Sequence, residues 1–128
     1  IVQPGAIIGA HALINTGASV DHDNTIGAFA HISPQAALCG HVEVGEGTHV
    51  GAASTVIPKV KIGRWVTIGA GSVVLSDIPD FSVAYGNPAR IVRVDLALQE
   101  LVGGLSKLAA PGISKRNRRN VKEYGNYR

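Results

Sequence analysis

The sequence is poor in the residue types that mark several classes of protein. It has one cysteine, Cys39, so no disulfide framework can form within the chain. It has no methionine, and aromatic residues make up only 5% although 45% of the residues are hydrophobic. It shows no signal peptide and no apolar run long enough to span a membrane. These absences predict a cytoplasmic protein with a narrow aliphatic core.

Negative charge is scarce near the C-terminus. The formal net charge of the 128 residues is +3. Residues 1–93 hold five Lys/Arg against six Asp/Glu, whereas residues 94–128 hold seven against three. The basic character therefore belongs to the tail, which we interpret as a solvated end. No nucleic-acid-binding motif accompanies it, so we expect no nucleic-acid partner.

A branched aliphatic residue occurs at every sixth position from Val2 to Val74. The series is Val2, Ile8, Ile14, Val20, Ile26, Ile32, Leu38, Val44, Val50, Val56, Ile62, Ile68 and Val74. An α-helix cannot produce this period, because its apolar face recurs at three and four residues. A parallel β-helix built from hexapeptide repeats does produce it.

The repeat predicts triangular coils of three hexapeptides, about four coils in all, with each aliphatic pointing inward. Four positions after the aliphatic comes a small or β-branched residue that lets the chain turn, and only Asn24 departs from this rule. Glycines that follow the aliphatic are interpreted as supplying unusual backbone angles. They are Gly9, Gly27, Gly45, Gly51, Gly63 and Gly69.

Four segments are expected. Residues 1–74 form the β-helix, residues 75–93 leave the repeat and cap its C-terminal end, and residues 94–110 have apolar residues at helical spacing. Residues 111–128 form the basic tail. The sequence begins inside a repeat at Ile1 and has no methionine, which leaves open whether an upstream domain is missing.

Residues eighteen apart should stack on successive coils. This places Gly40 beside His22, His41 beside Asp23, and His49 beside His31. Two stacked imidazoles disfavour double protonation, so at least one of the last pair should be neutral. A neutral imidazole beside a carboxylate suits a general base, so we expect one site within residues 15–41.

Two other β-helix functions fit poorly. A zinc carbonic anhydrase needs three converging histidines, and the spacings of the five histidines here do not resemble those of that family. An ice-binding helix needs a regular threonine ladder on one flat face, which the threonines do not form. We therefore expect a reaction that requires no metal.

The segment Ile14–Asp23 (INTGASVDHD) and the following FAHISPQA resemble the sialic acid O-acetyltransferase and UDP-amino-sugar N-acetyltransferase group, which includes enzymes of bacillosamine and perosamine synthesis. The similarity covers roughly residues 1–93, including GNPAR near the end. It implies an all-β, left-handed parallel β-helix, although parallel connections are normally right-handed. It also implies a homotrimer with acetyl-CoA in a groove between subunits.

The resemblance implies roles for individual residues. His22 matches the catalytic base, Asp23 the acid that orients it, and Asn15 a substrate-binding residue. His31 matches a second histidine near the acyl thioester, and Gly40 a backbone N–H facing the thioester carbonyl. Residues that would line the coenzyme A arm are Gly51, Ala52, Gly69, Ala70, Asn87, Pro88 and Arg90.

The function expected from this resemblance is acetyl transfer from acetyl-CoA to the amine of a nucleotide-linked amino sugar. O-acetylation of a sugar or of sialic acid is one alternative, and a non-catalytic trimeric scaffold is another. The group usually carries an N-terminal αβ domain that helps to bind the sugar nucleotide, and these 128 residues contain none.

Overall fold

The computed structural model describes residues 1–109 of the chain, with side chains as far as residue 105. Twelve two-residue strands follow one another at six-residue intervals, and each ends on the repeated aliphatic residue. They are β1 (Ile7–Ile8), β2 (Leu13–Ile14), β3 (Ser19–Val20), β4 (Thr25–Ile26), β5 (His31–Ile32), β6 (Ala37–Leu38), β7 (Glu43–Val44), β8 (His49–Val50), β9 (Thr55–Val56), β10 (Lys61–Ile62), β11 (Thr67–Ile68) and β12 (Val73–Val74).

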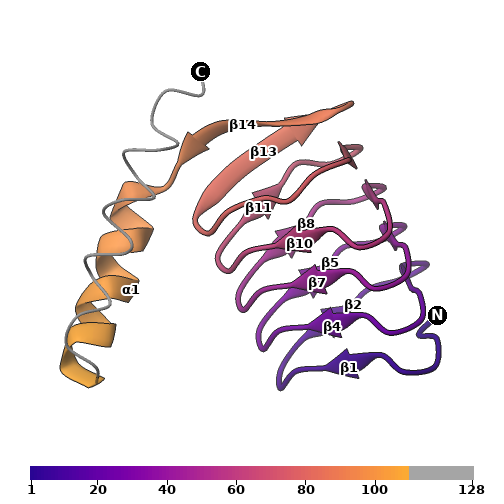
Figure 1. Ribbon diagram of the computed structural model, residues 1–128, viewed down its shortest axis with the longest axis horizontal. Coiled ribbons are helices and arrows are strands. Elements are labelled where there is room, and N and C mark those ends of the chain that lie inside the picture. The colour runs from indigo at the N-terminus through magenta and orange to yellow at the C-terminus, as the bar shows by residue number, and fades with distance from the viewer. Residues whose placement is uncertain (110–128) are drawn as a thin grey trace.

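The strands form three parallel sheets that run along the stack (Figure 1). One sheet contains β1, β4, β7 and β10, a second contains β3, β6, β9 and β12, and a third contains β2, β5, β8 and β11. Paired residues are eighteen apart, as in Leu13 with His31 and His31 with His49. The predicted coil of three hexapeptides is therefore confirmed.

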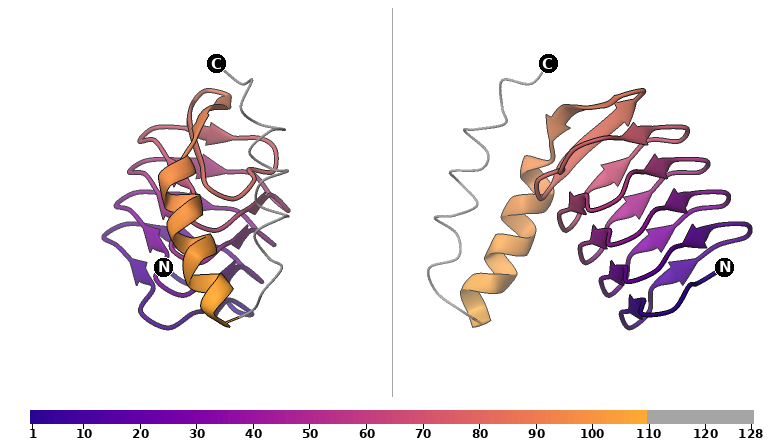
Figure 2. Two further views of the ribbon diagram at one scale, coloured as in Figure 1. Left: turned by 90° about the vertical axis from the view of Figure 1, so that its left-hand side faces the viewer. Right: turned by 45° about the vertical axis from the view of Figure 1, so that its right-hand side comes forward.

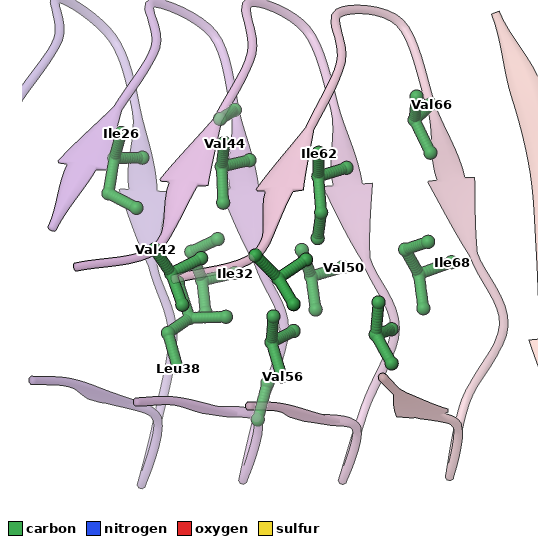
Figure 3. Close-up of a cluster of buried hydrophobic side chains, with 14 of the residues drawn as sticks. Ile26, Ile32, Leu38, Val42, Val44, Val50, Val56, Ile62, Val66 and Ile68 are labelled. Atoms are coloured by element: carbon green, nitrogen blue, oxygen red, sulfur yellow. The ribbon is translucent and has the colours of Figure 1, made fainter. Parts of the chain in front are cut away.

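The core is a column of aliphatic side chains inside the coils. From Val20 to Val74 every repeated aliphatic is buried, and those one coil apart form rows along the axis (Figure 3). Val2 and Ile8, in the first coil, remain 49% and 39% exposed, because residues 1–109 place no coil beneath them. The core therefore begins with the second coil.

Polar residues at the fourth position satisfy backbone groups at the inner corners. The Asn24 side chain is fully buried, and its Oδ1 accepts a hydrogen bond from Val42 N at 2.6 Å. The Thr48 hydroxyl accepts from Val66 N and donates to Gly63 O. These bonds explain why polar side chains are tolerated inside an apolar tube.

The interpretation of the glycines that follow the aliphatic was wrong. None has a positive φ. They are needed because the next coil passes too close for a side chain: a β-carbon on Gly27 would lie 2.5 Å from Glu46 N. Positive φ occurs instead two residues later, again with period six, and there often without glycine. The residues with positive φ in this series are Gly5, His11, Gly17, Asp23, Phe29, Gln35, His41, Gly47, Ala53, Lys59, Trp65 and Gly71.

After β12 the chain closes the end of the stack. Ile78 is buried and bridges to Ile62, and the buried Phe81 follows outside the repeat. Strand β13 (Ser82–Gly86) pairs in parallel with β11, and β14 (Ala89–Val94) returns antiparallel to β13. This hairpin extends the third sheet by two strands.

Helix α1 (Leu96–Ala109) then runs back beside the stack (Figure 2). Asp95 caps its start, because Oδ1 of Asp95 accepts from Leu98 N at 3.0 Å. Gln99 is buried, whereas Leu101 and Leu105 are more than 60% exposed. No helix among the described residues is long and apolar enough to cross a membrane. The expected tail, residues 111–128, lies outside the described residues.

Candidate active site

Two corners of the triangular coil carry the residues singled out in the sequence. The His22 corner joins the sheet of β3 to the sheet of β4, and its turns include residues 21–24 and 39–42. The Asn15 corner joins the sheet of β2 to the sheet of β3, and its turns include residues 15–18, 33–36, 51–54 and 69–72. The strand row of β3, β6 and β9 separates the two corners.

At the His22 corner, an imidazole and a carboxylate form a pair. His22 Nδ1 lies 3.1 Å from Asp23 Oδ2, and both side chains are about half exposed, at 53% and 52%. Because an ionised carboxylate only accepts, Nδ1 carries the proton of a neutral ring. The Asp23 carboxylate thereby leaves the lone pair of His22 on Nε2.

Gly40 lies directly against that nitrogen. A β-carbon at position 40 would stand 2.6 Å from His22 Nε2. The N–H of Gly40 has no hydrogen-bond acceptor within residues 1–109, while its carbonyl accepts from Lys59 N. Three prolines share its position in the repeat, Pro4, Pro34 and Pro58, which shows that the inter-coil ladder does not use this N–H. It is therefore available to a ligand.

His41 completes the corner, as the eighteen-residue stacking predicted. Its Nε2 is 3.9 Å from Asp23 Oδ2, and its ring meets that of His22 edge to face at 5.0 Å. His22, Asp23 and His41 each offer one ligand atom within 4.8 Å of the others. These three residues could therefore hold a metal ion.

The Asn15 corner holds a second polar cluster. Asn15 Nδ2 is 3.3 Å from His31 Nε2, and the rings of His31 and His49 stack at 4.7 Å between centroids. Ser33 Oγ is 2.6 Å from His49 Nε2, a contact that sequence reasoning missed because the residues are not eighteen apart. Burial lowers the pKa of His49, and the facing His31 lowers it further. Both effects favour the neutral form of the His49 ring, in the direction that the stacking predicted.

The residues proposed for coenzyme A also gather at the Asn15 corner. Gly51 and Ala52 stack beneath Gly69 and Ala70, and a β-carbon at Gly51 would lie 2.5 Å from Ile68 O. The cis Asn87–Pro88 peptide forms the loop between β13 and β14. Arg90 pairs with Tyr85, whose Cβ lies against Gly69.

The structure therefore divides the expected site. It brings His22, Asp23 and Gly40 together at one corner, and it places Asn15 and His31 at the next. These residues are close in the sequence, within residues 15–41, so the sequence did not predict this division. The chain passes from one corner of the coil to the next every six residues.

Comparison with known proteins agrees with this fold. Residues 41–76 match the bacterial transferase hexapeptide family (six repeats). No curated protein sequence matches the chain. The acetyltransferase domain of PglB from Neisseria gonorrhoeae, solved with acetyl coenzyme A, is 41% identical with a TM-score of 0.70. The match covers 70% of this chain and 44% of that chain.

Two further solved structures are similar. A mutant of GDP-perosamine N-acetyl transferase from Caulobacter crescentus, in complex with CoA and GDP-perosamine, is 47% identical with a TM-score of 0.70; the match covers 70% of this chain and 43% of that one. A serine acetyltransferase in complex with cysteine is 32% identical, with a TM-score of 0.70 and coverage of 75% and 42%.

This chain thus spans less than half the length of these three structures. The family match, residues 41–76, spans strands β7 to β12 of the stack. Residues 41–76 thus match the bacterial transferase hexapeptide family, and the chain is similar to the acetyltransferase domain of PglB and to GDP-perosamine N-acetyl transferase.

Proposed function

We propose that this protein transfers the acetyl group of acetyl-CoA to the amine of a nucleotide-linked amino sugar, with His22 as the general base. The proposal is carried by His22 Nε2 lying against Gly40, whose N–H has no acceptor within residues 1–109. The similar structures solved with acetyl coenzyme A, or with CoA and GDP-perosamine, support the choice of donor and acceptor.

The corner supplies the two groups that acetyl transfer to an amine requires. A sugar amine is protonated near neutral pH and must lose a proton to attack the thioester carbon. His22 Nε2 accepts a proton as the new C–N bond forms, while Asp23 stabilises the resulting imidazolium through Nδ1–H. The Gly40 N–H donates to the developing oxyanion, an interaction typically worth about 3 kcal/mol.

The division between two corners favours a homotrimer as the active form. His22 and Gly40 lie at one corner, whereas Asn15, His31 and the residues proposed for coenzyme A lie at the other. Within one chain these groups lie on opposite sides of the strand row of β3, β6 and β9. Two copies packed corner to corner would bring them to a single acetyl group, with the thioester between His22 of one copy and His31 of its neighbour.

Subunit complementation tests this arrangement. Chains carrying His22→Ala and chains carrying His31→Ala should each be inactive alone. Dissociating and reassembling them together should restore activity, because some interfaces then combine an intact His22 corner with an intact Asn15 corner. Mixed assemblies that remain inactive would contradict a shared site.

The reaction itself is tested by following CoA thiol release from acetyl-CoA. The acceptors are a panel of UDP-, GDP- and dTDP-amino sugars, together with sialic acid as an oxygen acceptor. We expect release with an amino sugar and a loss of at least about a hundredfold in His22→Ala. His11→Ala, which removes an exposed turn histidine from another corner, is the matched control.

The outcomes separate the alternatives. Release with sialic acid alone would make the protein an O-acetyltransferase. Near-normal turnover in His22→Ala would remove His22 from the mechanism. If acetyl-CoA neither reacts nor protects the protein against thermal unfolding, the protein is a trimeric scaffold, because a ligand at a hundred times its Kd should add about 2.7 kcal/mol to stability.

A further inference from the structure

We propose that His22, Asp23 and His41 form a binding site for a divalent transition metal ion of the Zn²⁺ type, and that the bound ion inhibits the protein. Each residue offers a ligand atom within 4.8 Å of the others. Two imidazoles and one carboxylate are the donors that Zn²⁺, Co²⁺ and Ni²⁺ prefer. Inhibition rests on the proposed function, whereas binding does not.

Backbone geometry sets the three side chains in place. Asp23 and His41 occupy the same position of the repeat, eighteen residues apart, and both have φ of 58°. Their side chains therefore leave adjacent coils in nearly the same direction. Gly5 lies one coil below, and a β-carbon there would come within 2.1 Å of Asp23 Oδ1. The side chain of Asp23 thus occupies space that any residue other than glycine would fill.

The distances require only small adjustments to surround an ion. Both imidazoles face Asp23 Oδ2, with His22 Nδ1 at 3.1 Å and His41 Nε2 at 3.9 Å. Ligand atoms bound at about 2.0–2.1 Å to one zinc ion stand about 3 Å apart. The side chains are about half exposed, so small rotations can close the remaining gap. No other side chain among residues 1–105 bonds to the Asp23 carboxylate.

The ion would act on His22 through its tautomer. In the metal-free pair the proton of His22 lies on Nδ1 and bonds to Asp23, so the lone pair is on Nε2, beside Gly40. A metal ion that binds Nδ1 displaces the proton from that nitrogen, and the proton of the neutral ring is then carried on Nε2. A protonated Nε2 cannot accept the proton of the acceptor amine. Metal binding and general base catalysis are therefore mutually exclusive.

Direct titration tests the site. The full chain, prepared without a histidine tag, is titrated with Zn²⁺ by calorimetry and with Co²⁺ by visible absorption. We expect one ion per chain. His41→Asn should weaken binding by at least about tenfold, because losing even a hydrogen-bonding partner of a metal ligand costs about that much. Asn is chosen because it tolerates positive φ.

His11→Asn is the matched control. His11 is also a histidine with positive φ at a turn, but its ring stacks on Phe29 at a different corner. The His11→Asn protein should bind Zn²⁺ with the same affinity as the wild type. Asp23→Asn should also weaken the binding of Zn²⁺. This second variant replaces His41→Asn in the test if His41→Asn does not fold.

Three results would overturn the site. The first is that the wild-type chain binds neither Zn²⁺ nor Co²⁺ supplied in molar excess, and the second is that wild type and His41→Asn bind Zn²⁺ with equal affinity. The third is that His11→Asn loses as much affinity for Zn²⁺ as His41→Asn does. In the activity arm, Zn²⁺ should inhibit CoA release by the wild type, and His41→Asn should need at least about tenfold more Zn²⁺. Binding without inhibition of an active protein would overturn the tautomer mechanism. Binding to a chain that is inactive on every acceptor would contradict only the proposed function.

Discussion

Gly40 lies one coil from His22, so close that a β-carbon on Gly40 would stand 2.6 Å from Nε2 of the imidazole. The missing side chain therefore leaves Nε2 accessible, beside a backbone N–H that has no acceptor within residues 1–109. In the proposed reaction, the imidazole of His22 is the base and the N–H of Gly40 is the donor to the oxyanion.

Gly40→Ala should abolish most activity while leaving the fold intact. The new methyl group would displace the His22 ring, and a misplacement of about 1 Å at a reacting group can cost about a hundredfold in rate. Folding should survive because Gly40 does not have a positive φ, and Ala28 and Ala52 occupy the same position of the repeat. The measurements are CoA release and thermal unfolding.

Gly104→Ala is the control for this substitution. Apart from its own helix backbone, a β-carbon at Gly104 meets nothing within 4 Å among the described residues, so activity should not change. Full activity in Gly40→Ala would mean that His22 is not held against Gly40 during the reaction.

Ile32→Asp should prevent cooperative folding. The Ile32 side chain is fully buried in the aliphatic column, and an unpaired carboxylate there should cost about 4 kcal/mol or more. Thr67→Asp, at an exposed outward position of β11, should unfold nearly as the wild type does. Circular dichroism during urea denaturation gives the comparison, and a cooperative Ile32→Asp protein would show that Ile32 does not face the core.

Thr48→Val should lower the free energy of unfolding by about 1–3 kcal/mol. The change keeps the shape but removes the hydroxyl that accepts from Val66 N at 3.1 Å, leaving a buried N–H without its partner. Thr55→Val is matched to it, because the Thr55 hydroxyl makes no hydrogen bond within residues 1–105. Equal stability of the two variants in urea would show that the inner-corner bond contributes nothing.

Stability should fall as the pH drops below about 6.5, the ordinary pKa of histidine. Burial, and then the facing His31, hold the pKa of His49 in the folded state below that value. The unfolded chain therefore binds a proton that the folded chain does not, and acid favours unfolding. The contribution is fully present above the unfolded pKa and is lost as pH falls toward the folded pKa.

His49→Gln should reduce this pH dependence. The free energy of unfolding is measured in urea at a series of pH values for wild type, His49→Gln and the surface control Thr67→Ser. The control should keep the wild-type slope between neutral and mildly acidic pH. If the free energy of unfolding of His49→Gln depends on pH as strongly as that of the wild type, His49 is not the group whose pKa folding lowers.

The repeat made much of the site predictable. A fixed period of six specifies which residues stack, so the neighbours His22 with Gly40, Asp23 with His41, and His31 with His49 followed from adding eighteen. The role of the glycines did not follow. Gly27 tolerates no side chain because of the next coil, and the period alone does not reveal how closely the backbones approach.

The sequence by itself determined the parallel β-helix, the inward register and the stacked pairs, because each depends only on which residues recur at six and eighteen positions. Only the tertiary structure decided that His22 and His31 stand at different corners, that Ser33 contacts His49, and that the Gly40 N–H has no acceptor within residues 1–109. These features depend on where each turn directs its backbone and side chains in space. A linear period carries no such information.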